Sequence, residues 1–412
     1  MDKIQAVAGN AFLQRIKAMF MQNNVKISRF KEAEIIPADQ LVIEGNLDNL
    51  QSVEFELCVI PGGNRSEFAE DVPGEQRRLL VRNRKRPILF ESLDEGNSWR
   101  KIDLGSVLDT PVIRVFTLKD GRHIIQAGEP LMTICLDSDW NVLFKQQASK
   151  YKWHGSCSIA ESADGTVIFS EYRGTNSDET FVEPLSAWRL QPGKMEWEKV
   201  FSHDAHGKTP DGYIRHFHTC MSDPYIEGRW YLSSGDIGEQ NKFWLSDDNG
   251  DSWKEIKAQV ENPEECKLGE EMRVLRYTSA VITEEAIYWV TDDNLGTGSS
   301  AFVRMDKSRA EMPIKVLCRF EKNLMRSLTA IDSERFFCIS ESKDDTSCVD
   351  FFIISSEGDI LASHKITNIS EERCPVTLSI GSGLVLNNYA FFPALGRIFS
   401  ERRDSILRIK VA

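Results

Sequence analysis

The stretch Ser92-Leu93-Asp94-Glu95-Gly96-Asn97-Ser98-Trp99 has a second copy, Ser246-Asp247-Asp248-Asn249-Gly250-Asp251-Ser252-Trp253. Both copies fit the pattern Ser-x-Asp-x-Gly-x-Ser-Trp, and each lies between two strand-like runs. The glycine permits a positive φ, the Ser and Asp side chains can bond to turn backbone groups, and the Trp supplies a large apolar surface that packs on a sheet. Two copies of one such hairpin turn predict a repeated β architecture.

The pattern closely resembles the Asp-box, or BNR repeat, of the sialidase-like β-propellers. In that family the box joins the third and fourth strands of a blade and lies away from the active-site face. The resemblance therefore implies a propeller fold and a structural part for the box. The family's early Arg-Ile-Pro motif is absent, since Arg86-Pro87 lacks the Ile and precedes a box. We accordingly carry over no sialidase catalytic residue.

Paired strand patterns recur along most of the chain, and a second strand pair follows each hairpin. Four strands per unit at a period of about 40–60 residues is typical of propeller blades. We predict an all-β fold, a single β-propeller of four-stranded antiparallel blades, with seven blades favoured and six as the alternative. The seven units are 38–104, 112–147, 156–201, 216–257, 275–319, 325–365 and 376–411. Residues 37–412 then form the propeller, and residues 1–36 form an N-terminal extension with the pattern of a short amphipathic helix over 11–21.

The charge, the apolar runs and the cysteines of the sequence argue against several classes of function. The formal net charge of −13 over 412 residues argues against general binding of nucleic acid or of an anionic membrane surface. No run reaches the roughly 18 apolar residues that a membrane span needs. The nine cysteines are odd in number and scattered without a CxxC pair, which indicates buried free thiols in a reducing compartment. We expect a cytoplasmic protein, and the sequence does not indicate its oligomeric state.

Basic residues stand at the predicted starts of the innermost strands, which line the central channel of a propeller. Four of them lie five residues before an equivalent apolar position: His154, His216, Arg276 and Arg326. Side chains alternate along a strand, so His216 and His218 share one face. That pair can bind an anion, act as acid and base, or ligate a metal. In the structural alternative, one His faces the channel and the other is hydrogen-bonded in the core. We predict neither a metal site nor a cofactor.

Acidic residues end the second strands at the same rim. Glu171 and Tyr172 are nominated from that position, although adjacent residues of a strand point to opposite faces. Asp236 follows a permissive Gly and can instead cap a turn. The predicted catalytic residues are Glu171, Tyr172, His216, His218 and Asp236. The predicted substrate-binding residues are His154, Arg173, Arg215, Arg276 and Arg326. The run 82–86 is interpreted as a solvated turn.

A basic inner ring that meets acidic rim residues suits an acidic glycan. Our first hypothesis is a carbohydrate-active enzyme, either a glycosidase or a lyase, that acts on an acidic oligosaccharide or polysaccharide in the central funnel. Cationic side chains would hold the carboxylate or phosphate, and the rim residues would supply acid–base or nucleophilic chemistry. The alternative is a non-catalytic propeller that binds a glycan or a protein. Fold alone does not decide between the two hypotheses.

Overall fold

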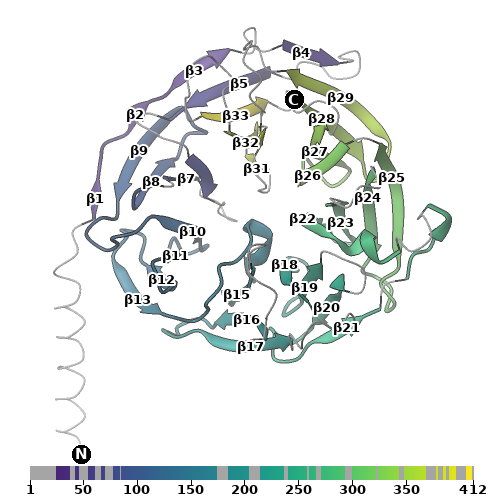
Figure 1. Cartoon of the computed structure of the whole chain (residues 1–412), viewed down its shortest axis with the longest axis horizontal. Helices are drawn as coiled ribbons and strands as arrows, with labels where there is room; N and C mark the ends of the chain where they lie inside the picture. The colour runs from purple at the N-terminus through teal and green to yellow at the C-terminus, as the bar shows by residue number, and fades with distance from the viewer. Residues whose placement is uncertain are drawn as a thin grey trace, which may run out of the picture.

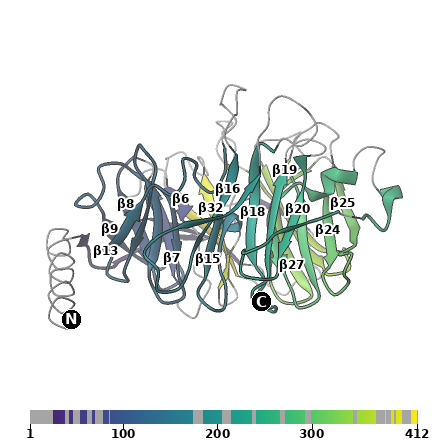
Figure 2. The ribbon, with the colours of Figure 1, turned by 90° about the horizontal axis from the view of Figure 1, so that it is seen from below.

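The computed structural model arranges the strands of the chain in a ring around a central axis (Figure 1). It describes all residues except 1–24, 38–41, 46–53, 61–65, 70–77, 84, 174–183, 204–213, 236–239, 258, 266–270, 293–298, 322, 343–347, 368–376, 379–383, 387–388, 396–404 and 411–412. Seen edge-on, the sheets stand side by side across a flattened body (Figure 2). Within the described residues, no helix is both long and apolar enough to cross a membrane.

Six blades each consist of four strands that follow one another in the chain and pair antiparallel. The first blade is β6 (Ser66–Ala69), β7 (Leu79–Asn83), β8 (Ile88–Ser92) and β9 (Ser98–Asp103), and the second is β10 (Val112–Thr117), β11 (His123–Ala127), β12 (Met132–Leu136) and β13 (Val142–Gln146). The third is β14 (Ile159–Glu161), β15 (Val167–Ser170), β16 (Leu185–Leu190) and β17 (Glu198–His203), and the fourth is β18 (His216–Ser222), β19 (Trp230–Gly235), β20 (Phe243–Ser246) and β21 (Lys254–Ile256). The fifth is β22 (Tyr277–Ile282), β23 (Ala286–Thr291), β24 (Ser299–Asp306) and β25 (Ile314–Glu321), and the sixth is β26 (Asn323–Ala330), β27 (Arg335–Ser342), β28 (Cys348–Ser355) and β29 (Ile360–Thr367).

The two ends of the described chain share one further sheet, which completes the ring. From the N-terminal side it takes β3 (Glu34–Pro37) and β5 (Glu54–Val59), and from the C-terminal side β30 (Thr377–Leu378), β31 (Leu384–Leu386), β32 (Tyr389–Leu395) and β33 (Ser405–Lys410). Its central pairing joins β5 to β33 antiparallel, with Cys58 opposite Ile406. Three short strands extend the neighbouring blades: β1 (Lys26–Ile27) and β2 (Lys31–Glu32) pair with β9, and β4 (Val42–Gly45) pairs with β29.

The prediction of seven regular four-stranded blades is therefore wrong. The structure has six blades of consecutive strands: the predicted unit 38–104 holds the first blade together with β4 and β5, and the predicted unit 376–411 holds only strands of the shared sheet. The prediction assumes that each blade is one contiguous stretch of chain. Closure of the ring instead pairs strands from opposite ends of the chain. Strand β5 lies inside the first predicted unit but pairs with β33, which lies inside the last.

The strands follow from the apolar pattern of the sequence. All five residues of β8 and of β11 are buried. Both are middle strands of their blades, and the two faces of a middle strand pack against the neighbouring sheets on either side. The outer strand β17 has the burial pattern of an edge, with exposed residues at Glu198, Lys199 and Ser202. An apolar cluster fills each interface between consecutive blades from the first to the sixth. These clusters hold the ring together through apolar burial.

The two Ser-x-Asp-x-Gly-x-Ser-Trp turns form the same hydrogen bonds. In the second copy, the Ser246 hydroxyl donates to Asp248 (2.8 Å) and accepts from the Gly250 amide (2.9 Å). Asp248 also accepts from the amide of Ser252 at 2.9 Å, and the Trp253 indole donates to the Gly250 carbonyl at 3.0 Å. The first copy repeats each of these bonds. Both copies join the third and fourth strands of a blade.

Each of these turns is also tied to the preceding sheet of the ring. Asn249 and Glu95 occupy equivalent places with positive φ values of 56° and 61°. The Asn249 carbonyl accepts from Arg189 of the third blade (2.8 Å), and the Glu95 carbonyl accepts from Arg408 of the shared sheet (3.0 Å). The turn thus links neighbouring sheets as well as neighbouring strands.

Candidate functional site

Four aromatic and imidazole rings converge between the third and fourth blades. Tyr172 follows β15, and its ring centroid lies 4.1 Å from that of His154 and 4.2 Å from that of His216. The His216 and His218 centroids are 4.9 Å apart, and His154 lies 6.2 Å from His218. We call His154, Tyr172, His216 and His218 the ring cluster. The sequence-based nominations of these four residues therefore meet in one place.

The strand β18 positions the two buried histidines. A register shift between Phe217 and Thr219 places His218 at a β-bulge, where a side chain is re-aimed. As a result, His216 and His218 meet at 3.0 Å through their Nε2 atoms. The Ser158 hydroxyl donates to the His218 carbonyl at 2.7 Å and so ties the third blade to this strand.

Hydrogen bonding indicates the tautomers of this pair. The Nδ1 atom of His216 lies 2.9 Å from the Arg173 carbonyl, which accepts only, so Nδ1 carries a proton. In a neutral His216 ring, Nε2 is then an acceptor, and it receives the Nε2–H of His218. Gly235 packs on the other side, where an added Cβ would lie 3.0 Å from the His218 Cε1 atom. The pair is thus fixed by its own strand, the Arg173 backbone and Gly235.

His154 and Tyr172 are the partly exposed members of the ring cluster, whereas His216 and His218 are each only 2% exposed. Burial, together with the nearby charges of His218 and Arg114, lowers the pKa of His154 well below its usual value. The imidazole of His154 is therefore neutral near pH 7 and is a potential proton acceptor. Of the four rings, those of His154 and Tyr172 are therefore the ones that solvent reaches.

Cationic side chains gather beside the cluster. The Arg114 guanidinium donates to the carbonyls of Trp153 (3.0 Å) and His154 (2.6 Å). The backbone of Lys152 lies against Tyr172, whose amide donates to the Lys152 carbonyl at 2.7 Å. Burial, with repulsion from Arg114 and Arg82, lowers the pKa of Lys152 to about 8. Burial is the larger cause of this lowered pKa, and the two arginine charges add to it, so an anionic ligand would relieve the repulsion between the three cations.

Three basic residues of this site, Arg82, Arg114 and Lys152, were not nominated from the sequence, and we call them the basic triad. Arg82 is the fourth residue of β7, and its Nη1 donates to the Val112 carbonyl at 3.1 Å, so it is not the solvated turn residue that we expected. Arg114 lies in the innermost strand of the second blade, directly after the bulge between Val112 and Arg114, and so one place beyond the position of His218 in β18. Lys152 stands two residues before His154, which was nominated.

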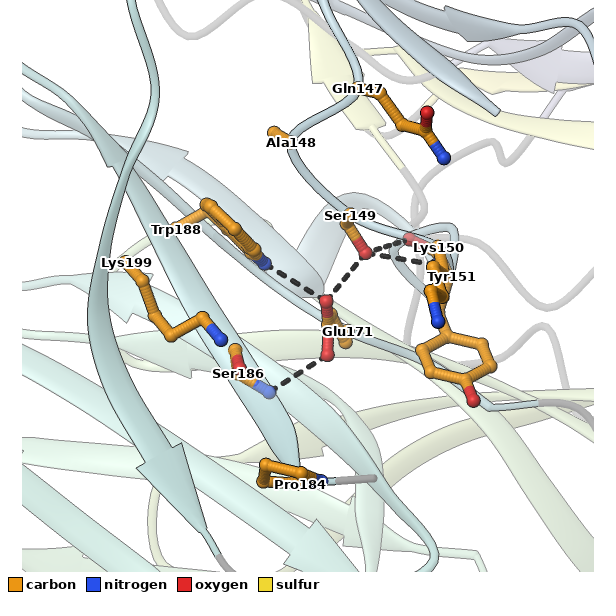
Figure 3. A pocket seen from close by; sticks show the side chains of 10 residues that line it. All are labelled: Gln147, Ala148, Ser149, Lys150, Tyr151, Glu171, Pro184, Ser186, Trp188 and Lys199. Carbon is orange, nitrogen blue, oxygen red and sulfur yellow. Dashed lines mark hydrogen bonds between the residues drawn. The ribbon is translucent and has the colours of Figure 1, made fainter. Parts of the chain in front are cut away.

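Glu171 is turned away from the ring cluster. Its carboxylate is 4% exposed and accepts bonds from Ser149 (2.6 Å), the Trp188 indole (2.9 Å) and the Ser186 amide (2.8 Å). Burial raises the pKa of Glu171, while these donors act in the opposite direction. Figure 3 shows the carboxylate among the side chains that line a cavity, held by the Ser149, Trp188 and Ser186 donors. Both residues follow β15, and their backbone amides donate to opposite neighbours, Glu171 to the Ser186 carbonyl (3.1 Å) and Tyr172 to the Lys152 carbonyl (2.7 Å).

The other nominated residues are dispersed. Arg173 is buried, with its guanidinium carbon 5.0 Å from the centroid of the Tyr151 ring. Arg215 is partly buried just before β18. The Nη2 atom of Arg276, just before β22, lies 3.9 Å from the Oδ2 atom of Asp292, just after β23.

Two nominations have no described side chain. Arg326 lies at the bulge of β26, where the register shifts between Met325 and Ser327. It therefore corresponds to His218 and not to His216. Asp236 lies outside the described residues, as do most of the predicted long loops after β15 and before β18. Among the described residues, no group of three or more His, Cys, Asp or Glu side chains is placed to hold a metal ion.

Comparisons with known proteins identify the fold alone. No family model matches the sequence. No curated protein matches it either. Among solved structures, virginiamycin B lyase from Staphylococcus aureus aligns with a TM-score of 0.55 at 10% identity, over 88% of this chain and 100% of that chain. The β-propeller domain of the Trilobed protease from Pyrococcus furiosus aligns with a TM-score of 0.42 at 13% identity, over 80% of this chain and 98% of that chain. The strand topology, together with the first of these similarities, shows a β-propeller fold.

Proposed function

We propose that the protein is a propeller enzyme that cleaves an acidic glycan by elimination at the ring cluster. The observation that carries the proposal is the convergence of His154 and Tyr172 beside Arg114 and Lys152. A neutral imidazole, a phenol and fixed positive charge are the groups that abstraction of a proton next to a carboxylate requires. The hydrogen-bonded turns at 92–99 and 246–253 support a relationship to the sialidase-like propellers.

The proposed reaction uses these side chains in sequence. The cations of the basic triad bind the carboxylate of a uronate residue and stabilise the negative charge that develops on it. The His154 imidazole removes the proton from the carbon next to that carboxylate. The electron pair forms a carbon–carbon double bond as the adjacent bond to the glycosidic oxygen breaks, and the Tyr172 phenol protonates the leaving oxygen. Proton transfer from His154 back to Tyr172 restores the site, so the cleavage needs no oxidant and no water.

Elimination fits the described residues better than hydrolysis by two carboxylates. A glycosidase of that type places its two carboxyl groups about 5–9.5 Å apart around the scissile bond. Glu171 is the nominated carboxylate with a described position, and it faces the separate cavity instead of Tyr172. His216 and His218 then act as positioning residues, since they are buried behind Tyr172.

The test is an assay of the intact protein with uronate-containing oligosaccharides. Elimination creates a double bond conjugated to the carboxylate, which ultraviolet absorption detects, and mass spectrometry shows product masses that sum to the substrate mass without added water. Tyr172→Phe keeps the stacked ring but removes the proton donor, so turnover should fall by about 10²–10⁴-fold. Tyr225→Phe, at an exposed tyrosine elsewhere on the fourth blade, is the matched control.

Two results would count against the enzyme. Equal turnover in Tyr172→Phe and Tyr225→Phe would remove the ring cluster from the reaction. Saturable binding without any product, weakened by Lys152→Gln, would instead support the alternative of a non-catalytic glycan-binding propeller.

A further inference from the structure

A cavity of about 280 Å³ is lined by Glu171 and by none of the four residues of the ring cluster. One wall is the connection between the second and third blades, residues 147–151, and the opposite wall comes from β16 and β17 (Figure 3). Pockets for drug-sized ligands usually span about 300–1,000 Å³. The cavity therefore suits a molecule of monosaccharide size and is too small for a long chain segment.

The floor of the cavity is a hydrogen-bond acceptor. Glu171 Oε1 accepts from the Ser149 hydroxyl and the Trp188 indole, whereas Oε2 accepts from the Ser186 amide. A carboxylate has about four acceptor positions, two on each oxygen. These three bonds leave one acceptor position on Oε2, and Glu171 lines the cavity. A ligand hydroxyl can donate to that position without displacing any of the three bonds.

The rim of the cavity is cationic. Lys150 and Lys199 both line the cavity, and both side chains are exposed. The Lys199 ammonium lies 5.3 Å from the centroid of the Trp188 ring, close enough for a cation–π contact. An acceptor at the floor and positive charge at the mouth favour a ligand that carries hydroxyl groups at one end and an acidic group at the other.

We propose that this cavity is a second binding site for a single acidic sugar residue, separate from the ring cluster. A hydroxyl group of the sugar donates to Oε2 of Glu171, and its carboxylate meets Lys199 at the mouth. The choice of an acidic sugar over other small hydroxy acids rests on the proposed function. The site itself rests on the cavity, the acceptor at its floor and the charge at its mouth. Because none of the four residues of the ring cluster lines the cavity, both sites can be occupied together.

The experiment is a calorimetric titration of the full chain with glucuronate, with glucose as the uncharged probe. Lys199→Glu reverses the charge at the mouth, and Lys194→Glu makes the same change at an exposed position in the β16–β17 turn. We expect glucuronate affinity to fall by about tenfold or more in Lys199→Glu and to stay unchanged in Lys194→Glu. Glucose should bind more weakly than glucuronate to the unaltered protein.

Two results would overturn the second site: no saturable heat with glucuronate at millimolar concentration, or equal affinities in the two charge-reversal variants. A Lys152→Gln variant separates this site from the ring cluster, because it should lose oligosaccharide turnover and keep the part of glucuronate binding that Lys199→Glu removes. If the unaltered protein shows no turnover but binds glucuronate in a Lys199-dependent way, the proposed function fails and the cavity site stands. Turnover without that binding would support the proposed function and refute the cavity site.

Discussion

Gly250→Ala tests how the second Ser-x-Asp-x-Gly-x-Ser-Trp turn holds neighbouring blades together. Gly250 has a φ of +87°, in the region that favours glycine. A Cβ at this position would lie 2.8 Å from the Cδ1 atom of Ile168, which belongs to the preceding blade. The substitution therefore strains the turn and also crowds the interface between the third and fourth blades.

The expected loss of stability has two parts. A non-glycine residue in the left-handed region costs about 1–2 kcal/mol. Overpacking of a well-packed site costs about 1–3 kcal/mol more. The total of about 2–5 kcal/mol is a large share of the roughly 5–15 kcal/mol that stabilises a typical folded protein. We expect a clear shift of the urea midpoint, measured in parallel by tryptophan fluorescence and far-ultraviolet circular dichroism.

Gly193→Ala is the matched control, because Gly193 has a φ of +73° but no heavy atom lies within 4 Å of the added Cβ. It should lose only the conformational part, about 1–2 kcal/mol. If the two variants are destabilised equally, the contact with Ile168 contributes nothing, and the idea that the turn links the two blades is refuted for this position.

Three further outcomes follow from the geometry. Gly235→Ala places a Cβ 2.6 Å from the Asn241 Oδ1 atom and 3.0 Å from the His218 Cε1 atom, so oligosaccharide turnover should drop sharply while circular dichroism stays native; unchanged turnover would contradict a role for the packing around that histidine. Because the folded pKa of Lys152 is about 8 and its ordinary value is 10.5, the unfolded state binds more protons between these values, and stability should rise with pH across that window. Urea titrations of Lys152→Gln should show a flatter pH dependence there, and an identical slope would refute the shift. Arg408→Ala removes the bond to the Glu95 carbonyl and should accelerate proteolysis of the C-terminal strands in limited digestion, with Arg335→Ala as the control.

Much of the fold was predictable because it depends on residues close together in the chain. Each Ser-x-Asp-x-Gly-x-Ser-Trp turn makes its bonds within eight residues, and most strand pairs are hairpins. The blade count was mispredicted because the shared sheet pairs β5 with β33 across nearly the whole chain. No local pattern encodes that pairing, since its register is set by closure of the ring.

In the candidate site, too, the features that depend on neighbouring residues were predictable and those that depend on distant segments were not. His216 and His218 were recognisable as neighbours because they lie two residues apart on one strand. The alternation of side chains also indicated that Glu171 and Tyr172 would separate, although both had been nominated for one site. The sequence places Arg82 in a run that we interpret as a solvated turn. This interpretation is wrong for Arg82 because its side chain donates to the Val112 carbonyl of the next blade, a contact that no local pattern reveals.

By itself, the sequence determined the repeated turns, the strand pairs and the all-β class, since these depend on backbone preferences and hydrogen bonds within a few residues. Only the tertiary structure decided that six blades and a shared sheet close the ring. It also brought the basic triad, drawn from three parts of the chain, to the ring cluster, and it opened a separate cavity at Glu171. The physical reason is that these features join segments far apart in the chain, whose approach is determined by how the apolar faces of the blades pack around the ring.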